Sequence, residues 1–137
     1  MSANSSIPNP PRRARILCAD DHVHITNLLT RLLNSQGYDV HVANDGQTAL
    51  VALLTHPGGY DLVISDHDMP GLNGLELVRQ AKAAGYKASF IIHSGAMCAE
   101  MGACYADLGV THNLQKPVPS TEMLRSVKQL LNEPTSH

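Results

Sequence analysis

The sequence has little excess charge, few cysteines and no long apolar run, and each of these shortages excludes a class of protein. Ten Lys and Arg residues against twelve Asp and Glu residues give a net charge of −2, which argues against a nucleic-acid-binding surface. No apolar run approaches the length of a membrane span, and the polar N-terminus lacks the apolar core of a signal peptide. Three cysteines without framework spacing fit reduced thiols better than disulfides. We therefore expect a cytoplasmic protein that binds neither nucleic acid nor membrane.

The length of 137 residues and a hydrophobic content of 43% suit a single domain that buries a core of its own. Residues 1–14 are rich in Ser, Asn and Pro, which predicts a flexible N-terminal tail. The folded domain is expected over residues 15–132, with a C-terminal tail over residues 133–137. Because the chain ends soon after its last predicted helix, we expect a stand-alone domain without an output domain.

Five short apolar segments alternate with five segments of helical periodicity, which predicts an α/β fold with a parallel sheet between two helical layers. The predicted strands cover residues 16–19, 40–42, 62–64, 90–92 and 110–114. The first, third and fourth are apolar throughout, as strands buried on both faces must be, whereas the second and fifth alternate with polar residues, as edge strands do. The strand order 2-1-3-4-5 follows, which is that of a flavodoxin-like three-layer sandwich.

Helix starts are marked by three capping candidates. Asp45 is placed to cap the second helix, and Ser120 to cap the fifth. Asn73 followed by Glu76 resembles a capping box at the start of the third helix.

Polar residues stand just past the ends of four of the predicted strands. Asp20 and Asp21 follow the first strand, Asp66 the third, Ser94 the fourth and Lys116 the fifth. Strands 1 and 3 are neighbours at the switch point of this fold, where ligands bind, so the three carboxylates should converge. When carboxylates lie this close together, a proton or a cation must stand between them, and an all-oxygen ligand set favours Mg²⁺. Together with a lysine and a hydroxyl, such a site suits phosphoryl transfer onto Asp66.

In this combination the residues resemble the receiver domain of bacterial two-component response regulators, of which the chemotaxis response regulator is the single-domain type. The resemblance covers residues 15–132. Met69-Pro70 and Gly74 follow Asp66 in the family's register, and Lys116 is followed by Pro117. The resemblance implies a flavodoxin-like fold and a role in phosphorelay signalling.

The same resemblance implies a role for each site residue. Asp66 is the phospho-acceptor, with Ser94 as the switch hydroxyl and Lys116 as the phosphate-sensing lysine. Asp21 and Asp66 bind Mg²⁺ directly, Asp20 binds it through water, and the backbone carbonyl of Asp68 completes the protein ligands.

The chain departs from the family at one position. Three residues before the lysine, where the family usually has a Tyr or Phe that rotates inward on phosphorylation, stands Asn113. Coupling of the hydroxyl to an aromatic ring cannot operate here in its ordinary form, so Ser94 and Asn113 form an altered switch.

The expected partners are a sensor histidine kinase or histidine phosphotransfer protein and a downstream protein that the sequence does not identify; a phosphorylation-dependent homodimer is left open. The domain is not expected to be an enzyme beyond its own phosphorylation and dephosphorylation. One alternative is a receiver-like binding module that is never phosphorylated. Another is a phosphatase of the Asp-x-Asp type, because residues 66–68 read Asp-His-Asp. Histidines at 22, 24 and 67 raise a transition-metal hypothesis, although their spacing matches no zinc pattern.

Overall fold

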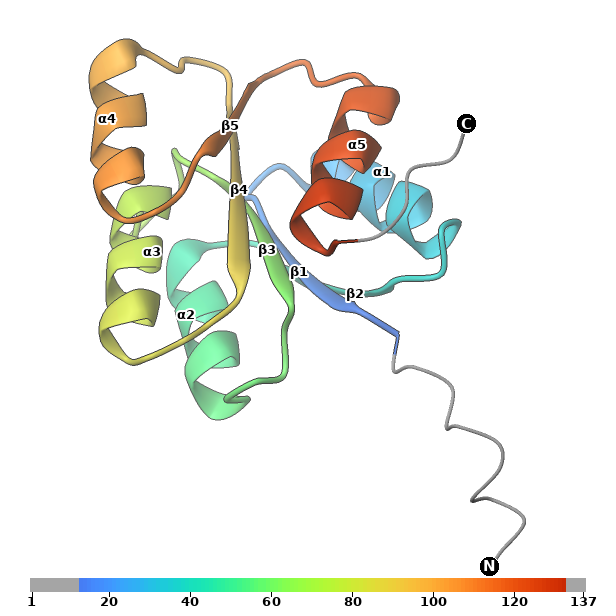
Figure 1. Cartoon of the computed structure of the whole chain (residues 1–137), viewed down its shortest axis with the longest axis horizontal. Coiled ribbons are helices and arrows are strands. Elements are labelled where there is room, and N and C mark those ends of the chain that lie inside the picture. The colour runs from blue at the N-terminus through green and yellow to red at the C-terminus, as the bar shows by residue number, and fades with distance from the viewer. Residues whose placement is uncertain (1–12, 133–137) are drawn as a thin grey trace, which may run out of the picture.

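The computed structural model describes residues 13–132 and shows a parallel five-stranded sheet between two layers of helices (Figure 1). The strands are β1 (Arg15–Ala19), β2 (Asp39–Ala43), β3 (Leu62–Asp66), β4 (Ser89–Ser94) and β5 (His112–Gln115). The helices are α1 (Val23–Asn34), α2 (Gly46–Thr55), α3 (Gly74–Ala83), α4 (Ala99–Asp107) and α5 (Ser120–Leu130).

The strands follow the order β2-β1-β3-β4-β5, which confirms the predicted flavodoxin-like topology. The three inner strands are buried along nearly their whole length, whereas β2 and β5 keep partly exposed residues. The uniformly apolar segments therefore do form the centre of the sheet, and the alternating ones form its edges.

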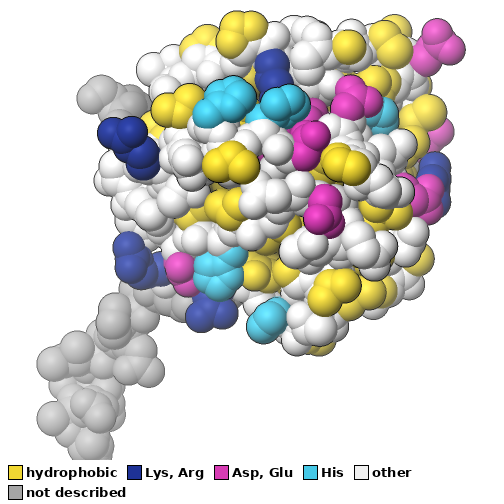
Figure 2. Space-filling model, turned by 180° about the vertical axis from the view of Figure 1, so that it is seen from behind, with side chains coloured by type: hydrophobic (Ala, Val, Ile, Leu, Met, Phe, Trp, Pro, Cys, Tyr) yellow, Lys and Arg dark blue, Asp and Glu magenta, His cyan; other side chains and the backbone are white. Residues whose placement is uncertain are grey.

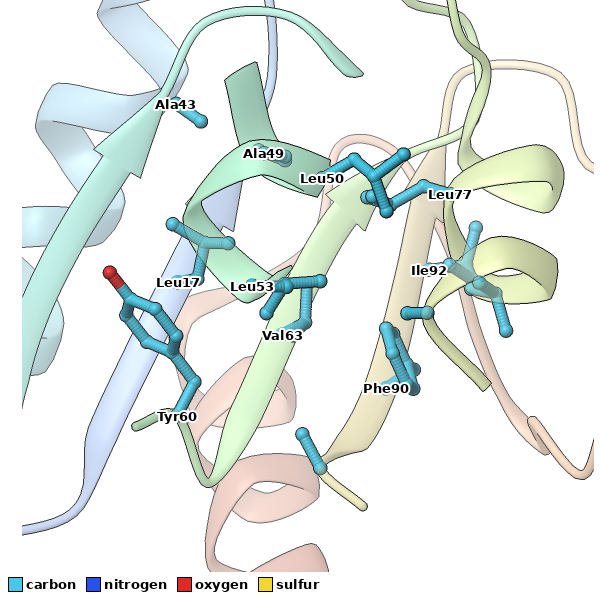
Figure 3. Packing of buried hydrophobic residues seen from close by; sticks show 14 of the residues in the cluster. Leu17, Ala43, Ala49, Leu50, Leu53, Tyr60, Val63, Leu77, Phe90 and Ile92 are labelled. Carbon is cyan, nitrogen blue, oxygen red and sulfur yellow. The ribbon is translucent and has the colours of Figure 1, made fainter. Parts of the chain in front are cut away.

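Two hydrophobic cores lie on opposite faces of the sheet, because α2, α3 and α4 cover one face and α1 and α5 cover the other (Figure 1). On the first face, Leu53 of α2 packs over Val63 of β3, and Leu77 of α3 lies beside Leu50 of α2 (Figure 3). On the second face, Leu33 of α1 lies in the same core as Ile64. Burying each side chain of this size contributes about 1.5–3 kcal/mol, so these helices hold the sheet edge that carries the site.

Two of the three predicted helix caps form. The side chain of Asp45 accepts a hydrogen bond from the Thr48 backbone N–H at 2.7 Å, and that of Asn73 accepts one from the Glu76 N–H at 2.9 Å. The prediction for Ser120 is wrong: it is the first residue of α5, and the N-cap position is occupied by Pro119.

The fifth strand begins later than the sequence pattern predicts. Gly109, with φ of 83°, ends α4, and the N–H of Val110 then donates to the carbonyl of Tyr105 at 3.0 Å. Because Val110 closes the helix end, it is unavailable to the sheet, and β5 starts at His112.

Most of the two predicted tails lies outside the described residues. Of residues 1–14, only Arg13 and Ala14 are described, and both are tied to the domain: Arg13 Nε donates to the Gly37 carbonyl, and the Ala14 carbonyl accepts from the Asp39 N–H. The domain boundaries at 15 and 132 stay a prediction. Within residues 13–132, none of the helices has the length and apolar character that crossing a membrane requires.

Candidate functional site

The predicted acids converge at the carboxyl-terminal edge of the sheet. Asp20 follows β1 and Asp66 ends β3, and these two strands pair side by side. Both side chains are buried, whereas Asp21 is exposed. One oxygen from each of the three carboxylates, together with a ring nitrogen of His22, lies within 4.8 Å of all the others. The convergence that the strand order predicted is confirmed.

Lys116 supplies the positive charge opposite the two buried acids. Its Nζ donates to Asp20 Oδ2 at 2.9 Å and lies 3.5 Å from Asp66 Oδ2. Its backbone is fixed as well, because the Lys116 N–H donates to the carbonyl of Ser94 at 2.8 Å. The lysine thus lies between the ends of β1 and β3, and partly compensates two carboxylates that would otherwise repel each other.

The environment drives the pKa values of the two buried acids apart. Burial alone would raise the pKa of Asp20, but hydrogen bonds from Lys116 and His22 outweigh it and hold this pKa below the usual range. Burial and the negative charge of Asp20 raise the pKa of Asp66. Asp20 is therefore a stable anion, and the carboxylate of Asp66 is the one that gains most from an added cation.

His22 belongs to the cluster because the chain folds back on Asp20. Asp20 Oδ1 accepts hydrogen bonds at 2.9 Å from both the backbone N–H and the ring Nδ1 of His22. This arrangement places the imidazole at the N-cap of α1, directly beside the acids. Burial of its hydrogen-bond partner makes the contact a strong one, and the bond to Asp20 raises the pKa of His22.

Figure 2 shows histidine, acidic and basic side chains next to one another near the upper edge of the molecule. Of the three histidines in the transition-metal hypothesis, only His22 offers a ligand atom to the acid cluster.

Ser94 and Asn113 lie on the two strands next to the acid cluster. Ser94 ends β4 and is buried, and its hydroxyl accepts a hydrogen bond from the N–H of Ala96 at 3.3 Å. Asn113 is half-buried on β5, and its Oδ1 has no hydrogen-bond partner in the described part of the chain. Gln115, two residues further along β5, donates to the Gly95 carbonyl at 2.6 Å and so holds the loop between β4 and α4.

A second contact links the site to α4. The Tyr105 hydroxyl lies 2.7 Å from Nδ1 of His67, the residue after Asp66. The Tyr105 ring is fully buried, and burial together with the charges of Asp66 and Asp68 raises its pKa. Asp68 itself has an exposed side chain, and its predicted role as a carbonyl ligand stays a prediction.

The sequence pattern did not reveal the position of His93 relative to the acids. It is buried in the sheet, and its Nε2 lies only 3.6 Å from Asp20 Oδ2. This nitrogen has no hydrogen-bond partner among residues 13–132. A polar residue in an otherwise apolar inner strand was the available signal, because such a residue needs a reason to be there.

The donor set fits a divalent cation. Carboxylate oxygens are ligands that Mg²⁺ prefers, and three of them lie within reach of a single ion. Burial and the charge of Asp20 raise the pKa of Asp66, so a cation bound beside this carboxylate would stabilise its charged form. Asp20, Asp21 and Asp66 are the residues that would hold the ion.

A comparison with protein families supports this interpretation. The family model described as the response regulator receiver domain matches residues 16–128, which is most of the chain. The chain therefore belongs to the response regulator receiver domain family.

Individual relatives and solved structures show the same likeness. The virulence sensor protein BvgS of Bordetella bronchiseptica is 35% identical over 96% of this chain, which spans 11% of that protein. The response regulator MprA of Mycolicibacterium vanbaalenii is 31% identical over 88% of the chain, which spans 52% of it.

Two solved structures share the architecture. The receiver domain of the Francisella response regulator 1452 has a TM-score of 0.80 at 28% identity, covering 88% of this chain and 98% of that one. The Vibrio cholerae chemotaxis protein CheY4 has a TM-score of 0.80 at 25% identity, covering 87% and 99%. The chain thus spans nearly the whole of the two solved structures and at most about half of the two larger relatives.

Proposed function

We propose that this domain accepts a phosphoryl group on Asp66 in the presence of Mg²⁺ and changes its protein contacts as a result. The observation that carries the proposal is the position of Lys116, whose Nζ lies within 3.5 Å of a carboxylate oxygen on both Asp20 and Asp66. A phosphoryl group on Asp66 would bring new anionic oxygens to this ammonium group, so the lysine is placed to sense it.

In the transfer step, an oxygen of Asp66 attacks the phosphorus of a phosphohistidine. The new P–O bond forms as the P–N bond breaks, and the electron pair of that bond returns to the donor's imidazole, which takes a proton from solvent. A bound Mg²⁺ would neutralise the negative charge that develops on the phosphoryl oxygens. Lys116 stabilises the same charge from the side of β5, and Ser94 offers its hydroxyl from the end of β4.

The phosphodonor is proposed to be a sensor histidine kinase or a histidine phosphotransfer protein. Support comes from the apolar face of α1 beside the site, where Leu28 is 60% exposed. A cavity of about 530 Å³ continues from this face to Lys116 and His93. A protein donor can bury exposed apolar side chains next to the reactive group, whereas a small phosphate ester cannot.

This docking face has a direct test that separates it from the chemistry. Leu28→Gln should slow phosphoryl transfer from a kinase or phosphotransfer protein that phosphorylates the wild type, by tenfold or more. It should leave labelling by the small donor acetyl phosphate unchanged. Leu54→Gln is the matched control, because Leu54 is 47% exposed on α2. Equal effects of the two variants would remove the α1 face from the proposal.

We further propose that the domain acts as a signalling component and not as an enzyme that turns over a free substrate. Its output would be a changed contact with a downstream protein or a second phosphorylated copy. The cytoplasm is the proposed location, with support from three free cysteines, two of them exposed.

The chemistry is tested by intact-protein mass spectrometry after incubation with Mg²⁺ and acetyl phosphate. We expect one phosphoryl group on the wild type and none on Asp66→Asn. Asp61→Asn is the control, since Asp61 directly precedes β3, at the end of the strand opposite to Asp66. If neither acetyl phosphate nor any kinase labels the folded, Mg²⁺-binding wild type, the domain is a binding module that works without phosphorylation.

A further inference from the structure

The acid cluster contains a nitrogen ligand that a magnesium site does not need. His22 Nδ1 lies 2.9 Å from Asp20 Oδ1, 3.3 Å from Asp21 Oδ1 and 4.0 Å from Asp66 Oδ2. The ring is held there by its own backbone, because the His22 N–H also donates to Asp20 Oδ1. The imidazole is therefore part of the cluster in its resting arrangement and does not have to swing in.

These spacings are those of ligand atoms around one octahedral ion. With metal–ligand bonds of about 2.1 Å, adjacent ligands stand about 3 Å apart and opposite ligands about 4.2 Å apart. The distances from Nδ1 to Asp20 and Asp21 match adjacent positions, and the distance to Asp66 approaches that of opposite positions. One ion could therefore contact the nitrogen and the carboxylates without a change in the backbone.

An unpartnered buried atom points to the same place from the other side. Nε2 of His93 is buried, has no hydrogen-bond partner among the described residues and lies 3.6 Å from Asp20 Oδ2. A buried polar nitrogen without a partner is costly, unless a ligand or a water bound to it completes its hydrogen bonding. A water bound to an ion in the cluster would do so.

We propose that His22, on releasing its Nδ1 proton to solvent, is a metal ligand through that nitrogen in place of its hydrogen bond to Asp20, and that the site prefers a first-row divalent transition ion to Mg²⁺. Imidazole binds Mg²⁺ poorly and binds ions from Mn²⁺ to Zn²⁺ well, whereas carboxylates accept both kinds. The proposal deepens the proposed function by naming the ion, and it rests on the same acid cluster.

Mn²⁺ is the probe for the test, because its electron spin reports bound nitrogen directly. In pulsed electron paramagnetic resonance of the protein with Mn²⁺, the wild type should show coupling to a histidine nitrogen. His22→Gln should lose that coupling. His24→Gln should keep it, since His24 lies beside His22 with ring centroids 5.9 Å apart but contributes nothing to the cluster. Both histidines are exposed, so both variants should fold, which circular dichroism verifies.

Affinities provide the second measurement. His22→Gln should weaken Mn²⁺ binding by about tenfold or more, a loss that even outer-shell partners of a metal can cause, and should change Mg²⁺ binding by less than about threefold. Equal losses for the two ions, or no nitrogen coupling in the wild type, would overturn the proposal. Acetyl phosphate labelling with Mg²⁺ is measured in parallel. Labelling without nitrogen coupling would support the proposed function and contradict the His22 metal site. Nitrogen coupling without labelling would support the metal site and contradict the proposed function.

Discussion

The Tyr105 hydroxyl lies 2.7 Å from Nδ1 of His67, and this contact joins the last turn of α4 to the residue that follows Asp66. The side chain of Tyr105 is fully buried between α4 and the sheet, on the face of the sheet that also carries Asn113. A phosphoryl group on Asp66 would disturb the backbone at His67 first. The chain thus has a buried aromatic hydroxyl next to its site, on a helix instead of on β5.

Replacing Tyr105 with Phe should remove this hydrogen bond and keep the ring. The free energy of unfolding should fall by about 0.5–1.5 kcal/mol, the usual net worth of such a bond. Phosphorylation should then shift fewer amide signals of α4 in NMR spectra. Tyr86→Phe is the control, because its hydroxyl bonds the His56 carbonyl far from the site. Identical α4 responses in wild type and Tyr105→Phe would show that the contact carries no signal.

Gly74 should resist replacement by alanine, whereas Gly102 should accept it. A Cβ on Gly74 would stand 2.5 Å from the Asp66 carbonyl oxygen and 2.7 Å from the Tyr105 hydroxyl, so the variant should lose about 1–3 kcal/mol of stability. A Cβ on Gly102 in α4 meets nothing within 4 Å, so Gly102→Ala should gain about 0.5–1 kcal/mol. Chemical denaturation followed by circular dichroism measures both, since the chain has no tryptophan. A neutral Gly74→Ala would contradict the packing described here.

Lys116→Met should destabilise the metal-free protein and blunt its response to phosphate. Because Asp20 would remain buried without its cation, the free energy of unfolding at pH 7 should fall by about 2–4 kcal/mol, and a divalent ion should restore part of the loss. Labelling by acetyl phosphate should continue at a reduced rate, with smaller spectral changes. Lys87→Met, an exposed control, should stay within about 0.5 kcal/mol of wild type. Equal spectral responses in Lys116→Met and wild type would rule out Lys116 as the sensor.

His93 should make the protein less stable as the pH falls. Burial, followed by the charge of Lys116, lowers its pKa from 6.5 to about 4. Since the unfolded chain takes up a proton below about pH 6.5 and the folded chain does not, the free energy of unfolding should fall between about pH 6.5 and 4, by about 3 kcal/mol in total.

The contribution of His93 is isolated by comparing variants in metal-free buffer. His93→Leu should lose this part of the pH dependence, because no imidazole remains to be protonated on unfolding. His24→Gln should keep it, since His24 is exposed on α1. Carboxylates titrate in all three proteins and cancel in the difference. Parallel stability curves for wild type and His93→Leu would contradict the assignment.

The sheet order and the convergence of the acids could be predicted because both follow from local patterns. Uniformly apolar strands must be central, and the carboxyl ends of neighbouring parallel strands must meet, so Asp20 and Asp66 had to be close. The start of β5 was mispredicted because Val110 is apolar and buried in either case, and only the closure of α4 onto Tyr105 removes it from the sheet. The apolar periodicity carries no information on that closure.

The contacts of the histidines depend on tertiary geometry that no spacing encodes. His22 reaches the acids through the turn that Asp20 makes with it, and His67 reaches Tyr105 across 38 positions of sequence. Sequence reasoning grouped His22, His24 and His67 in one metal hypothesis, whereas only His22 offers a ligand atom to the acid cluster.

The most direct test of the proposed function is to map the phosphoryl group to its residue. The protein is treated with acetyl phosphate and Mg²⁺ and then with borohydride, which reduces an acyl phosphate to an alcohol and so converts a phosphoaspartate into homoserine. Peptide mass spectrometry should find homoserine at position 66, with Asp20, Asp21 and Asp68 unchanged. Homoserine at another aspartate, with Asp66 intact, would contradict the assignment of the phospho-acceptor.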